Sequence, residues 1–186
     1  MSNSFLGFNK QAFFDLVKFI LITLIIVIPI RTWVAQPFVV SGASMLPTFD
    51  HGQYLIIDEL TYNFRSPKRG EVVVFRYPKE PNKFFIKRII GLPEETIEII
   101  DGEVTIIDSD NNTTILNEPY IKSSGGPEII AELNEKEYFV LGDNRSLSLD
   151  SRVWGPVAED MISGKVIIRL LPPNEISWRP GNFKNY

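Results

Sequence analysis

The hydrophobic positions fall into two regimes: one long apolar stretch near the N-terminus, and a series of short apolar runs after it. The stretch reads FFDLVKFILITLIIVIPIRTWVAQPFVV over residues 13–40. Its uncharged centre, Phe19 to Ile30, has 12 residues, which is about 18 Å as a helix, whereas a bilayer core is about 30 Å thick. Lys18 and Arg31 can extend toward the headgroups and Trp33 suits the far interface. We therefore expect a helix over 13–34, in a transmembrane anchor at 13–36 that follows a cytoplasmic tail of residues 1–12.

Two other interpretations of this stretch stay open. A cleaved signal peptide has an apolar run of similar length, and Ser41-Gly-Ala43 resembles a small-x-small cleavage site. Ala43, however, lies 13 residues beyond the run, and Arg31 follows the run directly. The other alternative is a buried core helix. The retained anchor is favoured, and its orientation is only weakly encoded, since Lys10 and Lys18 precede its centre and Arg31 follows it.

Beyond residue 37 the short apolar runs are rich in β-branched and aromatic residues and are bounded by turn residues, as strands are. We expect strands within residues 53–60, 71–78, 83–91, 136–144 and 164–172. Residues 95–108 contain two runs joined at Asp101-Gly102, a dipeptide typical of hairpin turns. Residues 108–128 are polar and rich in turn residues, which predicts a loop with at most one short strand. No soluble helix stands out, so the chain is predicted to be all-β and mostly antiparallel after the anchor.

Composition narrows the function classes. The 186 residues suffice for one domain, or for one domain with a small annex. The net charge of −4 comes without a long basic run, which argues against a nucleic-acid partner. The absence of cysteine excludes disulfides, thiolate metal sites and cysteine catalysis. A single histidine and no metal-ligand motif make a metal site unexpected, and we expect no cofactor.

The stretch SGASMLPTFDHG at 41–52 places Ser44 just beyond the apolar region, and a serine nucleophile needs a base. His51 lies in an Asp-His-Gly turn and is expected to be solvated. A lysine base must lose several pKa units through desolvation, and Lys87, inside FFIKRII, is the lysine with the most apolar neighbours. At strand period it shares a face with Phe85 and Ile89. The alternative is an edge-strand lysine that blocks aggregation.

A third segment, GDNRSLSLDSRVWG at 142–155, is polar and follows an apolar run. One interpretation is a solvated loop. The other is a rigid hydrogen-bond network, in which Asp150, Arg152 and Arg145 form a charge cluster and Arg88 is a further partner.

Taken together, these segments resemble the type I signal peptidases, the membrane-bound Ser–Lys endopeptidases of peptidase family S26. SGASMLPT is similar to the nucleophile motif of that family, RGEVVVFRYP to the strand that follows, FFIKRIIGLP to the general-base motif, and GDNRSLSLDSRVWG to the last signature. The four matches occur in the family's order, over about Phe38–Pro93 and Leu141–Pro173. The resemblance implies a β catalytic domain of the signal-peptidase and repressor-autoprotease type. Its core would occupy 37–93 and 138–186, with a small variable β subdomain at 94–137.

The resemblance also implies roles for individual residues. Ser44 would be the nucleophile, Lys87 the general base, and Ser148 the hydroxyl that holds the lysine toward Ser44. Asp150 and Arg152 would brace the site, with Arg88 as a further supporting residue. The Ser44 N–H would be one oxyanion donor, and the second donor is open, because Gly42 stands where some members have a serine. The residues expected to line shallow substrate pockets are Val40, Met45, Phe85 and Ile86.

The expected function is removal of signal peptides from exported pre-proteins after a small-x-small site, through an acyl-enzyme. The expected partners are those pre-proteins and the lipid bilayer. The protein would be a single-pass protein of the cytoplasmic membrane, with the catalytic domain on the extracytoplasmic face. Two alternatives remain: a self-cleaving repressor-like Ser–Lys protein, and a non-catalytic anchored β module in which Ser44 and Lys87 lie far apart.

Overall fold

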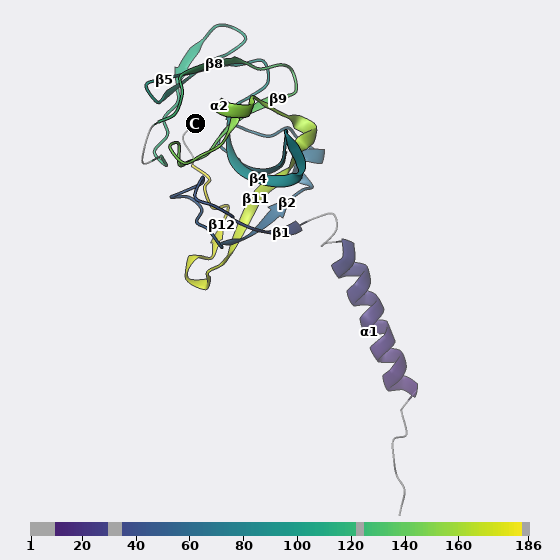
Figure 1. Cartoon of the computed structure of the whole chain (residues 1–186). Coiled ribbons are helices and arrows are strands. Elements are labelled where there is room, and N and C mark those ends of the chain that lie inside the picture. Colours follow the sequence, from purple (N-terminus) through teal and green to yellow (C-terminus); the bar gives the residue numbers. More distant parts are fainter. Residues whose placement is uncertain (1–9, 30–34, 122–124, 184–186) are drawn as a thin grey trace, which may run out of the picture.

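The computed structural model describes residues 10–29, 35–121 and 125–183. The N-terminal helix α1 (Lys10–Pro29) projects away from a β domain that contains the other elements (Figure 1). Within the described ranges, no helix combines the length and apolar character needed to cross a bilayer. The expected transmembrane span is therefore not confirmed, and residues 30–34 of the expected helix lie outside the described ones.

The larger of two antiparallel sheets carries the residues of interest. Its strand order is β1-β2-β11-β3-β4-β9-β10, with β12 paired to β11. The bounds of these strands are β1 Ala35–Val39, β2 Tyr54–Asp58, β3 Val72–Tyr77, β4 Glu80–Gly91, β9 Glu137–Leu141, β10 Val157–Ala158, β11 Ile162–Leu171 and β12 Ser177–Trp178. Short helical turns lie between them: η2 Thr61–Asn63, α2 Ser151–Trp154, η3 Glu159–Met161 and η4 Pro173–Glu175.

The large sheet curls, and the curl brings β1 against β4. Three strands separate β1 from β4 in the sheet, which in a flat sheet puts them about 19 Å apart. Yet the rings of Phe38 in β1 and Phe84 in β4 have centroids 5.4 Å apart. Twist and register shifts allow such closure, and shifts occur along β11 and β4. The end of β1 therefore faces β4 across the inside of the curl.

The smaller sheet has the order β7-β6-β5-β8. It comprises β5 Thr96–Ile100, β6 Glu103–Ile107, β7 Thr113–Ile115 and β8 Ile129–Glu132. The β5–β6 turn lies at Asp101 and Gly102, both with positive φ, as a tight hairpin turn requires. The inner face of the smaller sheet packs on the large sheet through Ile97, Val104 and Phe139, which belong to one buried cluster.

Most of the expected strands are confirmed, each within its predicted range or a few residues beyond it, and β7 is the one short strand expected within 108–128. The pattern missed β1, β8, β10 and β12. β1 begins at Ala35, so the last two residues assigned to the anchor form the first strand instead. β1 is short and contains Pro37, and it is a strand because it pairs along its whole length with β2.

Candidate active site

The loop after β1 holds Ser44 at the edge of the domain. Val40 N–H donates to Gln53 O at 3.0 Å and Gly52 N–H donates to Val40 O at 2.9 Å, which closes the loop at its base. Met45 and Phe49 are 1% and 0% exposed and fix the loop to the core. The side chain of Ser44 is left on the side that faces β4, at the wall of a cavity.

Lys87, in β4, reaches this serine. Its Nζ donates hydrogen bonds to Ser44 Oγ at 2.7 Å and to Ile86 O at 2.9 Å. Lys87 is only 4% exposed. The edge-strand alternative required a solvated lysine, and the binding-module alternative required a large separation from Ser44. The observed geometry fits neither.

Aromatic side chains keep water away from the lysine. The Phe85 ring lies 5.5 Å from Lys87 Nζ. Tyr77 stacks on Phe85 at 4.6 Å between centroids, and Trp154 packs edge-on against Phe85 at 5.6 Å. Burial lowers the pKa of Lys87 to about 8 from its ordinary 10.5, while the carboxylates of Asp150 and Asp143 act in the opposite direction. A substantial fraction of Lys87 is thus neutral near physiological pH.

His51 is not placed as a base for Ser44. It is exposed, and its Nδ1 accepts a hydrogen bond from Gly42 N–H at 3.2 Å. Its own N–H donates to Asp50 Oδ1 at 2.6 Å. This exposure agrees with the expectation of a solvated turn histidine. In addition, the imidazole braces the loop that carries Ser44.

Ser44 and Lys87 lie in the wall of a cavity of about 260 Å³ between the nucleophile loop and β4. Of the residues expected to line the substrate pockets, Val40, Phe85 and Ile86 do so. Met45 is the correction: it is buried in a core cluster with Phe49 and Leu55 and does not line the cavity. The loop turns back at Met45, where Phe49 N–H donates to Met45 O, so this side chain points inward.

Ser148 lies beside the dyad but is not hydrogen-bonded to Lys87. Its Oγ is buried and has no hydrogen-bond partner within the described ranges. It packs on Gly142, where an added Cβ would lie 2.5 Å from both Ser148 Cβ and Ser44 O. The expected Lys87–Ser148 hydrogen bond is therefore not formed in this structure, although the hydroxyl sits on the nucleophile's side of the loop.

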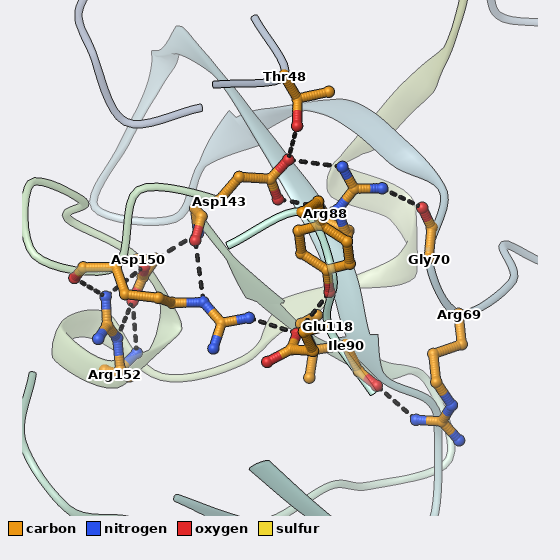
Figure 2. A network of polar contacts seen from close by, with 12 residues as sticks. Thr48, Arg69, Gly70, Arg88, Ile90, Glu118, Asp143, Asp150 and Arg152 are labelled. Carbon is orange, nitrogen blue, oxygen red and sulfur yellow. Dashed lines mark hydrogen bonds and ion pairs between the residues drawn. The ribbon is translucent and has the colours of Figure 1, made fainter. Parts of the chain in front are cut away.

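The expected charge cluster exists as separate ion pairs (Figure 2). Asp150 caps α2 and pairs with Arg152 at 2.8 Å, and it accepts Gly142 N–H at 3.0 Å. Arg88 does not join this pair. It holds Asp143 through two hydrogen bonds of 2.8 and 2.5 Å, and both side chains are essentially unexposed.

Several residues of this polar network were not singled out from the sequence. Asp143 accepts a hydrogen bond from Thr48 Oγ1 at 2.5 Å, across 95 positions of the chain. Arg145 pairs with Glu118, not with Asp150. The signals were present but weak: Asp143 lies two residues after the buried strand β9, and Glu118 is a lone acid next to a proline in an otherwise neutral run. Neither signal indicates which residue is the partner of Asp143 or of Glu118.

Across the parts of the chain that the structure describes, no three His, Asp or Glu side chains gather as metal ligands would. The groups that converge on the cavity are a hydroxyl and an amine, the two groups that a serine nucleophile with a lysine base requires.

Comparison with known proteins shows which family the chain resembles. The model of the family described as signal peptidase, peptidase S26, matches residues 13–171. Signal peptidase I of Leptolyngbya laminosa is 37% identical over 172 residues, covering 86% of this chain and 80% of that protein. Signal peptidase I V of Bacillus subtilis strain 168 is 32% identical over 160 residues, covering 78% and 91%. A solved signal peptidase I from Enterococcus faecalis V583 is 28% identical with a TM-score of 0.38, covering 54% of this chain and 97% of that one.

Proposed function

Since the chain belongs to the S26 signal peptidase family and is a serine endopeptidase of the signal peptidase I type, we propose that it removes signal peptides from exported pre-proteins with a Ser44–Lys87 dyad. The observation that carries this proposal is the 2.7 Å separation between Lys87 Nζ and Ser44 Oγ, in a site where burial lowers the pKa of the lysine to about 8.

The dyad acts by general-base catalysis. Neutral Lys87 takes the proton of the Ser44 hydroxyl as Oγ attacks the scissile carbonyl carbon. The protonated lysine then gives that proton to the leaving amine, and the C–N bond breaks to leave an ester on Ser44. Neutral again, Lys87 takes a proton from the water that attacks the ester carbonyl carbon, and it returns this proton to Ser44 Oγ as the C–O bond breaks and the acid is released. Lys87 makes every proton transfer of the cycle, so no second acid is required.

The tetrahedral oxyanion is placed at the Ser44 N–H. No acceptor for this N–H is found in the described part of the chain, so it is free to donate. Gly42 carries no hydroxyl, and its own N–H is held by His51 Nδ1. The second donor is therefore either the Gly42 N–H, after a substrate-induced shift of this loop, or a bound water. Donation by the Gly42 N–H requires its hydrogen bond to His51 to break.

The cavity suits small apolar side chains. Its walls are formed by β1 and β4, and Val40, Ile86 and Leu55 line it together with the dyad. An extended peptide laid between these strands places alternate side chains on the same side, which fits recognition of small residues at positions −1 and −3 from the cleaved bond.

We assign Ser148 the role of orienting Lys87 during turnover. A buried hydroxyl without a partner is unfavourable, which supports a role that appears when substrate is bound. Asp150 holds the Gly142 N–H on which Ser148 packs, and Arg152 holds Asp150. Asp150 and Arg152 thereby support the position of Ser148.

We place the segment 13–34, which includes most of α1 and extends beyond it, in the membrane as a single-pass anchor, with the catalytic domain on the extracytoplasmic face. Apolar side chains on α1 are widely exposed, as Phe14, Phe19 and Ile25 show at 69%, 68% and 69%. Apolar surface of this extent favours lipid. Membrane confinement of enzyme and pre-protein raises their effective concentration. Carbonate extraction of wild-type protein and of a variant that lacks residues 1–34 tests this placement, and release of both proteins alike contradicts it.

The activity test uses full-length protein in detergent with a peptide that carries an Ala-x-Ala site. Wild type is expected to cleave after the second alanine, and the Ser44→Ala and Lys87→Ala variants are not. Hydroxylamine should trap the acyl group as a hydroxamate of the N-terminal fragment. Cleavage that survives in Ser44→Ala contradicts the proposed nucleophile.

A further inference from the structure

We propose that Glu118 and Tyr120, on the segment between β7 and β8, are positioning residues for peptide cleavage and act through Arg145 and Arg88. The inference rests on the dyad mechanism proposed above. Both residues lie within 94–137, the segment that the family resemblance assigns to a small variable subdomain, outside the four motifs that carry the resemblance. Figure 2 shows Glu118 within the same polar network as Asp143 and Arg88.

Glu118 holds the backbone behind the dyad through Arg145. The two side chains form an ion pair and are only 4% and 3% exposed. Arg145 Nε also donates to Gly142 O at 3.1 Å. Gly142 is the residue on which Ser148 packs, and it approaches Ser44 O closely enough to exclude a Cβ. Glu118 therefore sets the position of Arg145, and Arg145 sets the position of this backbone.

Tyr120 acts on the other side of the same loop. Its hydroxyl donates to Glu118, and its ring lies 4.1 Å from Arg88 Cζ. Arg88 holds Asp143, and Asp143 accepts the hydroxyl hydrogen bond of Thr48, four residues after Ser44. Tyr120 therefore closes a chain of contacts that ends in the nucleophile loop.

The two chains of contacts converge on adjacent residues, Gly142 and Asp143, and a third contact links them to the nucleophile. Asn144 N–H donates to Ser44 O at 3.0 Å, and its side-chain amide donates to Ala43 O at 3.1 Å. The segment between β7 and β8 thus influences the position of Ser44 through residues 142–144. A buried ion pair is weak evidence for stability, so the cost of burying Glu118 and Arg145 points to a requirement for position.

Glu118→Gln keeps the shape of the side chain and removes its charge. We expect kcat to fall about 10- to 100-fold, as a small misplacement of reacting groups does. KM should change little, because neither Glu118 nor Tyr120 lines the cavity. The variant leaves Arg145 without its counter-charge, so the acidic limb of kcat/KM should move to lower pH as the added positive charge disfavours protonated Lys87. A purely structural loss lowers activity at every pH and leaves the limb in place.

Glu132→Gln is the matched control, since Glu132 is an exposed acid in β8, the strand that follows the segment of Glu118 and Tyr120. Its kcat, KM and pH limb should equal those of wild type. Tyr120→Phe retains the ring over Arg88 and should keep more activity than Tyr120→Leu, which loses it. Circular dichroism melting of each variant checks that the fold is intact.

If Glu118→Gln does not fold, the double variant Glu118→Gln/Arg145→Met removes both buried charges and carries the test. Its kcat should remain at least about 10-fold low, because Gly142 O has lost its donor. The proposal is overturned if folded Glu118→Gln, or the folded double variant, cleaves with wild-type kcat, or if kcat of folded Glu118→Gln falls with no shift of the pH limb. The double variant removes both charges of the pair, so its limb should stay in place. Failure of wild type and Glu132→Gln to cleave at all concerns the proposed function instead.

Discussion

Lys87 Nζ lies 2.7 Å from Ser44 Oγ, although 43 positions separate the two residues and β1, which leads into the loop of Ser44, is not a neighbour of β4 in the sheet. The contact exists because the sheet curls and carries β1 over β4. The same curl buries Lys87 beneath Phe85 and lowers its pKa to about 8. One feature of the fold thus positions the nucleophile and also prepares the base.

The dyad should behave as one unit. Ser44→Ala and Lys87→Ala are each expected to remove nearly all cleavage, and the double variant should be no worse than either single variant. His51→Ala should stay within a few-fold of wild type, since the imidazole is hydrogen-bonded to the loop backbone at Gly42 N–H and not to Ser44. Steady-state cleavage of the Ala-x-Ala peptide measures all four. Abolished turnover in His51→Ala together with an active Lys87→Ala would assign the base to the histidine.

The pH profile should report the buried lysine. Only neutral Lys87 accepts a proton, and its pKa is lowered to about 8, so kcat/KM should rise with pH through a limb near 8. A histidine base would place this limb near 6.5. Measurements of kcat/KM from pH 5 to 10 check the midpoint. A limb near 6 that disappears in His51→Ala contradicts the assignment.

Lys87 should cost the protein stability at neutral pH. Its pKa is about 8 when folded against an ordinary 10.5, so between these values the unfolded chain binds more protons and stability rises with pH. Below pH 8 the cost is at its maximum, at most roughly 3 kcal/mol. Lys87→Met should therefore unfold at higher urea than wild type at pH 7, with a smaller difference at pH 10. A difference that grows with pH contradicts this sign.

Ser148→Ala should impair catalysis more than binding. We expect kcat to fall about 10- to 1000-fold, or roughly 1.4–4 kcal/mol, with little change in KM, because the hydroxyl limits the rotamers of the lysine. Ser146→Ala is the control, since Ser146 is exposed and its Oγ donates only to Asn144. Equal kinetics for the two variants would leave the buried Ser148 hydroxyl without a catalytic role.

Gly142→Ala should be severely harmful. An added Cβ would lie 2.5 Å from both Ser148 Cβ and Ser44 O, and the backbone at Ser44 can yield only by moving the nucleophile. Activity should fall about 100-fold or more. In Gly125→Ala the new Cβ meets only Ser146 Cβ at an ordinary 3.9 Å, so near wild-type cleavage is expected. Wild-type cleavage by Gly142→Ala would show that the loop tolerates displacement.

Sequence pattern predicted the individual strands well where apolar runs alternate with turn residues. The runs at 53–60, 71–78 and 164–172 became β2, β3 and β11, and Asp101-Gly102 became a hairpin turn. It failed at β1 and β8, whose residues are strands because of the strands beside them. Strand pairing is a long-range property, and a local window does not contain it.

The sequence by itself determined which residues could do the chemistry. A serine at the end of an apolar region, a lysine among Phe and Ile, and the order of four motifs were enough to select Ser44 and Lys87. The tertiary structure alone decided which partners meet: Arg88 with Asp143 and Thr48, and Arg145 with Glu118. It also turned Met45 into the core and left the Ser148 hydroxyl unpaired. The physical reason is that side-chain chemistry is local to a residue, whereas burial and charge pairing depend on segments that only the folded sheets bring together.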